Sequence, residues 1–221
     1  MSSARARATA AAVPSGARAV RIALAALLVL LTGCASKPPS RPEDICAVFR
    51  EKDGWFEEWF EDAADAEEAW NIPIPVMMAT MYQESKFRAK AKPPRGRLLW
   101  IIPWKRPSSA YGYAQVLDET WDGYRKATGN GGAERDDFGD AVDFVGWYHD
   151  GSAKKLGIPR SDANRLYLAY HEGQKGYQRG THQKKKWLLD VAKKVEGRAQ
   201  GYTQQLKKCR DELEGPWWWP F

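Results

Sequence analysis

Glu84 occupies the position in this sequence that best suits acid-base chemistry. It follows the apolar run of residues 76–82, which is expected to form a buried helix. Apolar surroundings raise the pKa of a carboxyl group, because desolvation disfavours the charged form. The negative end of the helix dipole acts in the same direction. We therefore expect Glu84 to keep its proton near neutral pH, although its spacing alone also fits a surface glutamate at a helix end.

Three short motifs, the first of them around Glu84, occur in a fixed order. Residues 83–85 read Gln-Glu-Ser, residues 111–115 read Tyr-Gly-Tyr-Ala-Gln, and residues 169–173 read Ala-Tyr-His-Glu-Gly. Together they resemble the motifs of the soluble lytic transglycosylase family, which has a lysozyme-like α fold and cleaves the glycan chain of peptidoglycan. The resemblance covers about residues 73–180 and rests on the order of motifs that are each weak alone.

The resemblance implies that Glu84 is the sole catalytic acid and base. Its proton would go to the glycosidic oxygen between N-acetylmuramic acid and N-acetylglucosamine. The carboxylate would then take a proton from the C6 hydroxyl of the muramoyl residue, which closes a 1,6-anhydro ring. No water is consumed, so one carboxyl group suffices where most glycoside hydrolases use two.

The resemblance also implies glycan-binding roles for residues that lie around the three motifs, namely Ser85, Gly112, Tyr113, Gln115, Tyr170, His171 and Glu172. Ser85 would hydrogen-bond near the acid, and Gln115 would contact the glycan. Gly112 would allow a close backbone approach. Tyr170 would orient Glu84 or the intermediate, and Tyr113 with nearby Tyr111 would stack on sugars. The ordinary alternative is a core residue for Tyr170, a capping amide for Gln115 and a turn for Gly112.

The third motif departs from the family pattern at two positions. His171 replaces the usual asparagine, and Glu172 replaces a small residue. Glu172 is also a candidate second carboxylate facing Glu84, which would permit true hydrolysis at a separation of roughly 5 to 9.5 Å. The interval before Gly112 is long, so residues 98–104 are interpreted as an added cleft wall, a partner contact or a satellite core.

The elements that position these motifs are mostly helical. Apolar residues recur at helical spacing, and few alternating runs indicate strands. Helices are expected at 55–70, 76–85, 118–127, 136–149, 161–171 and 182–213, with an irregular loop at 88–110 and turns at 71–75, 129–132 and 150–151. The length and the apolar content fit one core. The expected fold is a single, mostly α, lysozyme-like domain with a glycan-binding cleft.

The N-terminal segment has the pattern of a bacterial lipoprotein signal. Residues 1–33 combine arginines, the apolar run 22–31 and small residues, and residues 31–34 read Leu-Thr-Gly-Cys. We therefore expect a signal peptide over 1–33, a lipidated Cys34 and a linker over 34–42. A buried N-terminal helix with a chance cysteine is the alternative. No apolar run reaches the roughly 18 residues of a membrane span.

The remaining domain would occupy residues 43–221, with a long last helix and an aromatic tail. Ser36, two residues after Cys34, argues for the outer membrane rather than the inner one, in lipoproteins of this type. The domain would then face the periplasm. Cys46 and Cys209 would point inward near the two ends of the domain and are expected to form a disulfide there, with two buried free thiols as the alternative.

The charge of +6 does not indicate a nucleic-acid partner, because four arginines lie in the signal segment and the rest of the chain carries only +2. His149, His171 and His182 lack the spacing of a metal site, and no cofactor is expected. The sequence thus predicts a lytic transglycosylase bound to peptidoglycan strands and anchored by its lipid, with no protein partner identified. A catalytically silent peptidoglycan-binding lipoprotein and a lysozyme-type hydrolase are the alternatives.

Overall fold

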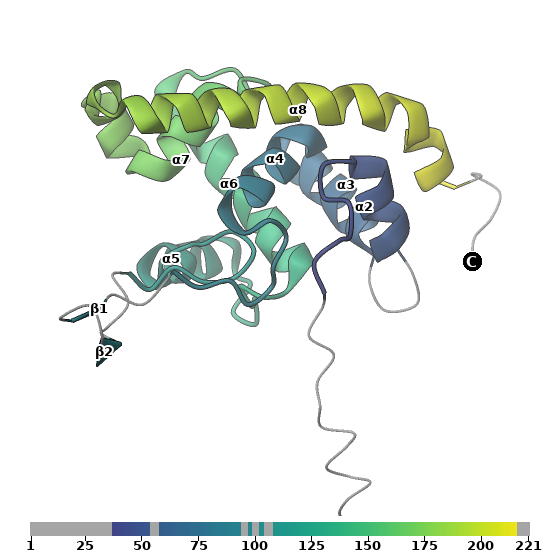
Figure 1. Cartoon of the computed structure of the whole chain (residues 1–221), viewed down its shortest axis with the longest axis horizontal. Coiled ribbons are helices and arrows are strands. Elements are labelled where there is room, and N and C mark those ends of the chain that lie inside the picture. The colour runs from purple at the N-terminus through teal and green to yellow at the C-terminus, as the bar shows by residue number, and fades with distance from the viewer. Residues whose placement is uncertain (1–36, 54–57, 94–96, 99–101, 104–107, 216–221) are drawn as a thin grey trace, which may run out of the picture. The chain divides into compact units, whose positions relative to one another are not determined.

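The computed structural model describes residues 37–53, 58–93, 97–98, 102–103 and 108–215, and these form a helical assembly (Figure 1). Contacts divide the chain into Met1–Ala35 and Ser36–Phe221, and every described residue belongs to the second unit. The helices are α2 (Ile45–Lys52), α3 (Trp59–Trp70), α4 (Ile74–Ser85), α5 (Asp118–Thr128), α6 (Phe138–Leu156), α7 (Ala163–Gln178), the 3-10 helix η1 (Thr181–Lys184) and α8 (Lys186–Leu213). The prediction of a mostly α fold is confirmed.

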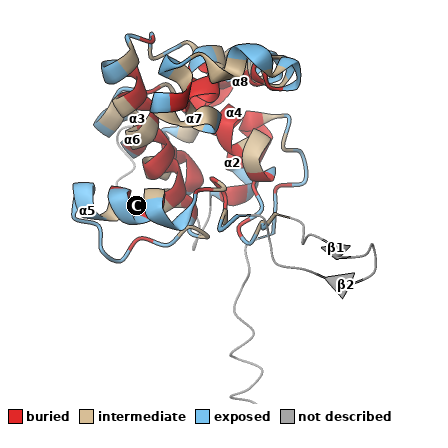
Figure 2. Ribbon diagram, turned by 90° about the vertical axis from the view of Figure 1, so that its left-hand side faces the viewer, coloured by how far each residue is buried: buried red, intermediate tan, exposed pale blue. Residues whose placement is uncertain are grey.

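Helix α4 forms the buried centre of the assembly. It begins just after Pro73, and Pro75 is tolerated in its first turn because the first backbone amides of a helix need no internal partner. Every residue from Ile74 to Met81 is buried (Figure 2). The long helix α8 packs across α4, α7 and α2, and α6 packs against α3 (Figure 1). This enclosure fixes the C-terminal end of α4, where Glu84 lies.

The structure corrects two element boundaries. The expected turn at 150–151 does not exist, because α6 continues through it to Leu156. Asp150 is buried in this helix, and its carboxylate forms ion pairs with Arg160 and with Lys154. These ion pairs stabilise the helical position of Asp150. Helix α7 extends to Gln178 but has a break at Gly173, whose φ of 71° only glycine adopts readily.

The loop expected over 88–110 contains a minimal sheet. Strands β1 (Arg97–Leu98) and β2 (Ile102–Pro103) pair antiparallel, with Leu98 opposite Ile102. Much of the candidate wall at 98–104 lies outside the described residues, as do residues 55–57 of an expected helix and the aromatic tail at 216–221. The signal segment and Cys34 lie outside them too.

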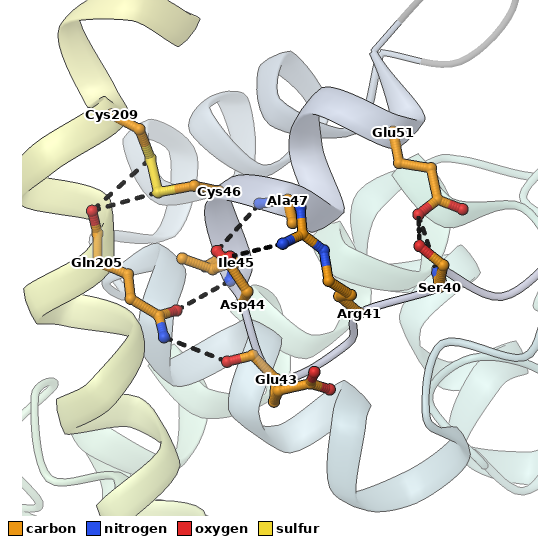
Figure 3. Close-up of polar contacts among 10 residues, drawn as sticks. All are labelled: Ser40, Arg41, Glu43, Asp44, Ile45, Cys46, Ala47, Glu51, Gln205 and Cys209. Atoms are coloured by element: carbon orange, nitrogen blue, oxygen red, sulfur yellow. Dashed lines mark hydrogen bonds and ion pairs between the residues drawn. A yellow bond between two sulfur atoms is a disulfide. The ribbon is translucent and has the colours of Figure 1, made fainter.

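A disulfide joins the two ends of the described domain. Cys46 of α2 and Cys209 of α8 are bonded with their Cα atoms 6.1 Å apart (Figure 3). Beside the bond, the side chain of Gln205 accepts a hydrogen bond from the Ile45 amide at 2.9 Å and donates one to the Glu43 carbonyl at 3.2 Å. The start of the domain is therefore fastened to its last helix. Within the described part of the chain, no helix is both long and apolar enough to cross a membrane.

Candidate active site

Glu84 lines a pocket with a volume of about 580 Å³. The pocket lies between the end of α4, the segment after residue 108, α6 and α7. Its lining includes Gln115, Leu117, Phe144, Tyr148, Tyr170, His171 and Glu172. The pocket therefore brings the first, second and third sequence motifs together around the candidate acid, over distances in the chain of up to about ninety residues.

The surroundings of Glu84 favour its protonated form. Burial among aromatic side chains raises its pKa from 4.5 to about 7, and a hydrogen bond from Tyr167 works against that rise. The Tyr167 hydroxyl donates to Oε1 of Glu84 at 2.9 Å. A carboxyl group with a pKa near the working pH can both release and regain a proton, which is what an acid that later acts as a base requires.

Tyr167, rather than Tyr170, donates a hydrogen bond to the candidate acid. Both residues lie on α7, but the Tyr170 hydroxyl donates to the Ala114 carbonyl at 2.6 Å. Tyr170 thus fastens the second motif to α7 while it lines the pocket. The expectation that Tyr170 orients Glu84 or the intermediate stays a prediction, and the hydrogen bond to Glu84 comes from Tyr167, one helical turn earlier. Sequence reasoning missed Tyr167 because it lies outside the motif and shares its apolar face with core residues.

Four other residues with expected glycan contacts do not line the pocket, and the side chains of two of them are buried. Tyr113 is only 1% exposed and packs edge-on against Trp59 and Phe138, so its ring is not open to a sugar. Ser85 is also buried, and its hydroxyl donates to the Met81 carbonyl at 3.3 Å. Both side chains therefore stabilise the domain rather than face the cleft.

Gly112 also serves packing. A Cβ atom added there would lie 1.9 Å from the Arg135 carbonyl oxygen, and the φ of Gly112 is +81°. The close approach that requires glycine is therefore between two segments of the protein. Gly112 fits the alternative interpretation, a residue in a turn, better than a contact with the glycan. Tyr111 likewise lies elsewhere, with its hydroxyl donating to Asp136 at 2.9 Å.

Gln115 holds the pocket wall in place. Its side-chain amide donates to the carbonyls of Ala91 and Gly112, both at 2.9 Å. Its backbone adopts a φ of 49°, which is unusual for a residue with a side chain. Arg135 adds a hydrogen bond to the Val116 carbonyl at 3.1 Å. The side chain of Gln115 thus lines the pocket while serving as the capping amide of its own turn.

Glu172 lines the same pocket as Glu84 but is held as a carboxylate. Burial works to raise its pKa, but hydrogen bonds from Lys185, Thr181 and His171 outweigh that effect and lower the pKa to about 2. Oε1 accepts from Lys185 at 2.7 Å and lies 3.2 Å from Nδ1 of His171, while Oε2 accepts from Thr181. Both oxygens are therefore engaged, and Glu172 fastens α7 to η1 and to the start of α8.

Two exposed apolar side chains border the pocket. Leu117, which is 45% exposed, lines it directly. Trp187, which is 56% exposed, packs edge-on against His171, with the ring centres 5.2 Å apart. Neither residue belongs to the three motifs, although an isolated tryptophan beside a lysine run was a visible signal. Such apolar faces are suited to the apolar faces of sugar rings.

The three histidines lie in three different elements, His149 in α6, His171 in α7 and His182 in η1. His149 is buried, its Nε2 lies 3.0 Å from the Thr80 hydroxyl, and burial lowers its pKa to about 3. Among the described residues, no group of three or more His, Cys, Asp or Glu side chains is arranged to hold a metal ion.

Tyr167→Phe tests the role of the hydroxyl that contacts Glu84. Because the hydrogen bond favours the charged carboxylate, its removal raises the pKa of Glu84 further. We expect the alkaline limb of the pH profile of kcat/KM to move to higher pH, with kcat reduced roughly tenfold by lost orientation. Tyr177→Phe, which removes a hydroxyl from the same helix, is the control. An alkaline limb that stays in place would contradict the assignment.

A protein-family model described as Transglycosylase SLT domain matches residues 22–209, which is most of the chain. The matched range contains Glu84 and both of the later motifs. No curated protein and no solved structure matches the chain significantly.

Proposed function

Because the chain belongs to the Transglycosylase SLT domain family, we propose that it is a peptidoglycan lytic transglycosylase with Glu84 as its catalytic acid and base. The bond cleaved is the β-1,4 bond between N-acetylmuramic acid and N-acetylglucosamine. The observation that carries this proposal is a single carboxyl group of raised pKa in the pocket where the three motifs meet.

In the proposed reaction, Glu84 donates its proton to the glycosidic oxygen as the bond from that oxygen to C1 of the muramoyl residue breaks. The C6 hydroxyl of the same residue then attacks C1, and the Glu84 carboxylate accepts the hydroxyl proton. Glu84 ends in its starting protonation state, and the product carries a 1,6-anhydro ring. The pKa of about 7 suits both transfers, because neither form of the carboxyl group is strongly disfavoured near neutral pH.

The state of Glu172 favours this reaction over hydrolysis. A two-carboxylate hydrolase needs its second group free to activate water or to attack the sugar. Here both oxygens of Glu172 are hydrogen-bonded and its side chain is only 4% exposed. Glu172 and His171 are therefore proposed to shape the far wall of the glycan site together with Tyr170 and Gln115.

Mass spectrometry of the fragments released from purified peptidoglycan by residues 36–221 tests the reaction. We expect anhydromuramoyl ends, and the same ends from Glu172→Gln at a reduced rate. Reducing ends that disappear in Glu172→Gln would instead establish a hydrolase. Binding to peptidoglycan without release of any fragment would indicate the catalytically silent alternative.

We further propose that the mature protein begins at an acylated Cys34 and is held at the periplasmic face of the outer membrane. The support is the signal-like pattern of residues 1–33, Cys34 at its end and Ser36 two residues later. Acyl chains anchor in proportion to the CH₂ groups they bury. The intact mass of the membrane-extracted protein is expected to include the acyl groups, and Cys34→Ser to leave the chain unprocessed. A mature protein of unmodified mass would contradict the anchor.

A further inference from the structure

A second pocket, with a volume of about 590 Å³, lies between the end of α4 and the middle of α8. It shares no lining residue with the pocket of Glu84. Three cations line it, Lys86 from the end of α4 and Lys194 and Arg198 from α8, against the single acid Glu43. None of the three cations forms an ion pair with a described residue. Their charge is thus available to a ligand.

Two tyrosines hold two of these cations, Arg198 and Lys86. The Arg198 guanidinium lies with its carbon 3.5 Å from the centre of the Tyr82 ring and 5.9 Å from that of Tyr202. The Lys86 ammonium lies 5.3 Å from the Tyr82 ring centre. Arg198 also hydrogen-bonds the Tyr202 hydroxyl. Stacking occupies the face of a guanidinium, so its remaining in-plane N–H groups can donate to an oxyanion. The pocket therefore presents donors that are already held in position.

Two glycines leave the helix side of this pocket open. Gly197 and Gly201 lie one turn apart within the 28-residue helix α8, and both line the pocket. A Cβ atom added at either position would meet nothing within 4 Å. Glycine weakens a helix interior relative to alanine, and no packing contact of the domain requires it here. The open space allows a ligand to approach the backbone of α8.

The linker enters the domain beside this pocket. The Tyr202 hydroxyl donates to the Pro42 carbonyl. Gln205 holds the Glu43 carbonyl and the Ile45 amide (Figure 3). Glu43 and Tyr202 also line the pocket. The stretch from Cys34 to Glu43, fully extended, spans on the order of 30 Å. A membrane that holds Cys34 would thus lie within reach of the three cations.

We propose that this pocket binds the phosphodiester headgroup of an anionic phospholipid and holds the catalytic domain against the membrane surface. The inference rests on the proposed anchor at Cys34, because the tether brings the pocket to the surface and raises the effective concentration of headgroups. Attraction between exposed charges fades beyond a Debye length of about 8 Å at physiological salt. The linker, on the order of 30 Å when extended, lets the pocket reach the membrane surface, where that attraction operates.

Sedimentation with lipid vesicles tests the pocket apart from both the anchor and the catalytic activity. Residues 36–221 form a separate unit that contains the described core and the disulfide, and this fragment carries no lipid. We expect it to bind vesicles that contain phosphatidylglycerol and not vesicles of phosphatidylcholine alone. Replacing Lys86 and Lys194 with glutamine should lower the partition coefficient roughly twenty-fivefold, at about fivefold for each cation.

Replacing Lys207 and Lys208 with glutamine is the matched control, because these exposed lysines lie on α8 outside the pocket and the net charge changes equally. A second pair of variants tests added negative charge, because each variant introduces one carboxylate. Gly201→Glu places the carboxylate in the pocket, and Gln204→Glu places it at an exposed position further along α8. Gly201→Glu should weaken binding about fivefold, and Gln204→Glu much less. Both positions tolerate glutamate in a helix, so folding is retained.

Three results would overturn the proposal. The first is equal loss of binding in the pocket variants and their controls, which would indicate attraction by diffuse charge. The second is no preference for phosphatidylglycerol vesicles. The third is saturable binding of glycerol 1-phosphate without vesicle binding, which would assign the pocket to a soluble phosphate ester. Peptidoglycan cleavage does not enter these measurements, so an inactive enzyme would leave them unchanged.

Discussion

Glu84→Gln is expected to lower kcat for the release of anhydromuramoyl fragments by about a thousandfold or more. The amide keeps the size of the side chain and can still meet the Tyr167 hydroxyl, but it cannot transfer a proton. General acid-base groups contribute roughly 10²- to 10⁴-fold, and here one group would serve both steps. Glu68→Gln, at an exposed position of α3, is the control and should leave kcat unchanged.

Glu84 also determines how kcat/KM is expected to depend on pH. Glu84 must be protonated to act first as an acid, so kcat/KM should fall as pH rises through about 7. The pH profile of the unmodified fragment measures this limb. A limb near pH 4.5, the ordinary pKa of a glutamic acid, would show that burial does not raise the pKa of Glu84.

Stability measurements separate loss of chemistry from loss of folding in Glu84→Gln. The folded pKa of about 7 exceeds the ordinary 4.5, so the folded state binds more protons than the unfolded state between these values. The free energy of unfolding of the unmodified protein therefore decreases as pH rises through that window. At pH 8 the variant should be more stable by on the order of 2 kcal/mol, and near pH 4 the difference should vanish. An inactive variant that is also less stable at pH 8 would contradict this account.

Replacing both Cys46 and Cys209 with alanine is expected to lower the free energy of unfolding by about 4 kcal/mol. The bond joins residues 163 positions apart, and closing so long a loop removes much conformational freedom from the unfolded chain. Tm should fall by roughly 10 °C. Urea unfolding followed by tryptophan fluorescence measures the difference.

Reduction of the unmodified protein is the control for the cysteine variant. Both side chains are buried, so alanine also removes packing, whereas a reductant breaks the bond alone. The reduced protein should lose most of the same stability, while kcat at 25 °C stays unchanged because the bond lies outside the pocket of Glu84. Equal unfolding midpoints with and without reductant would contradict a stabilising disulfide.

The amino-acid sequence by itself determined the helical architecture and the place of the candidate acid in it. Hydrophobic periodicity is a local property, and it locates α4 because that helix is buried along almost its whole length. Pro73 and Pro75 mark its start. The apolar run before Glu84 also predicts the direction of its pKa shift, since desolvation depends on the character of the neighbours more than on their exact positions.

Only the tertiary structure decided which side chains meet. Tyr167 and Tyr170 lie one turn apart on α7, and both could face the cleft by periodicity, but the packing of α7 against α4 brings the Tyr167 hydroxyl to Glu84. Gly112 is required by the backbone of Arg135, twenty-three residues away in the chain. The cations of the second pocket come from two helices separated by more than one hundred residues. Such pairings depend on how helices that are distant in the chain pack against one another, and the spacing of residues in the sequence does not determine that packing.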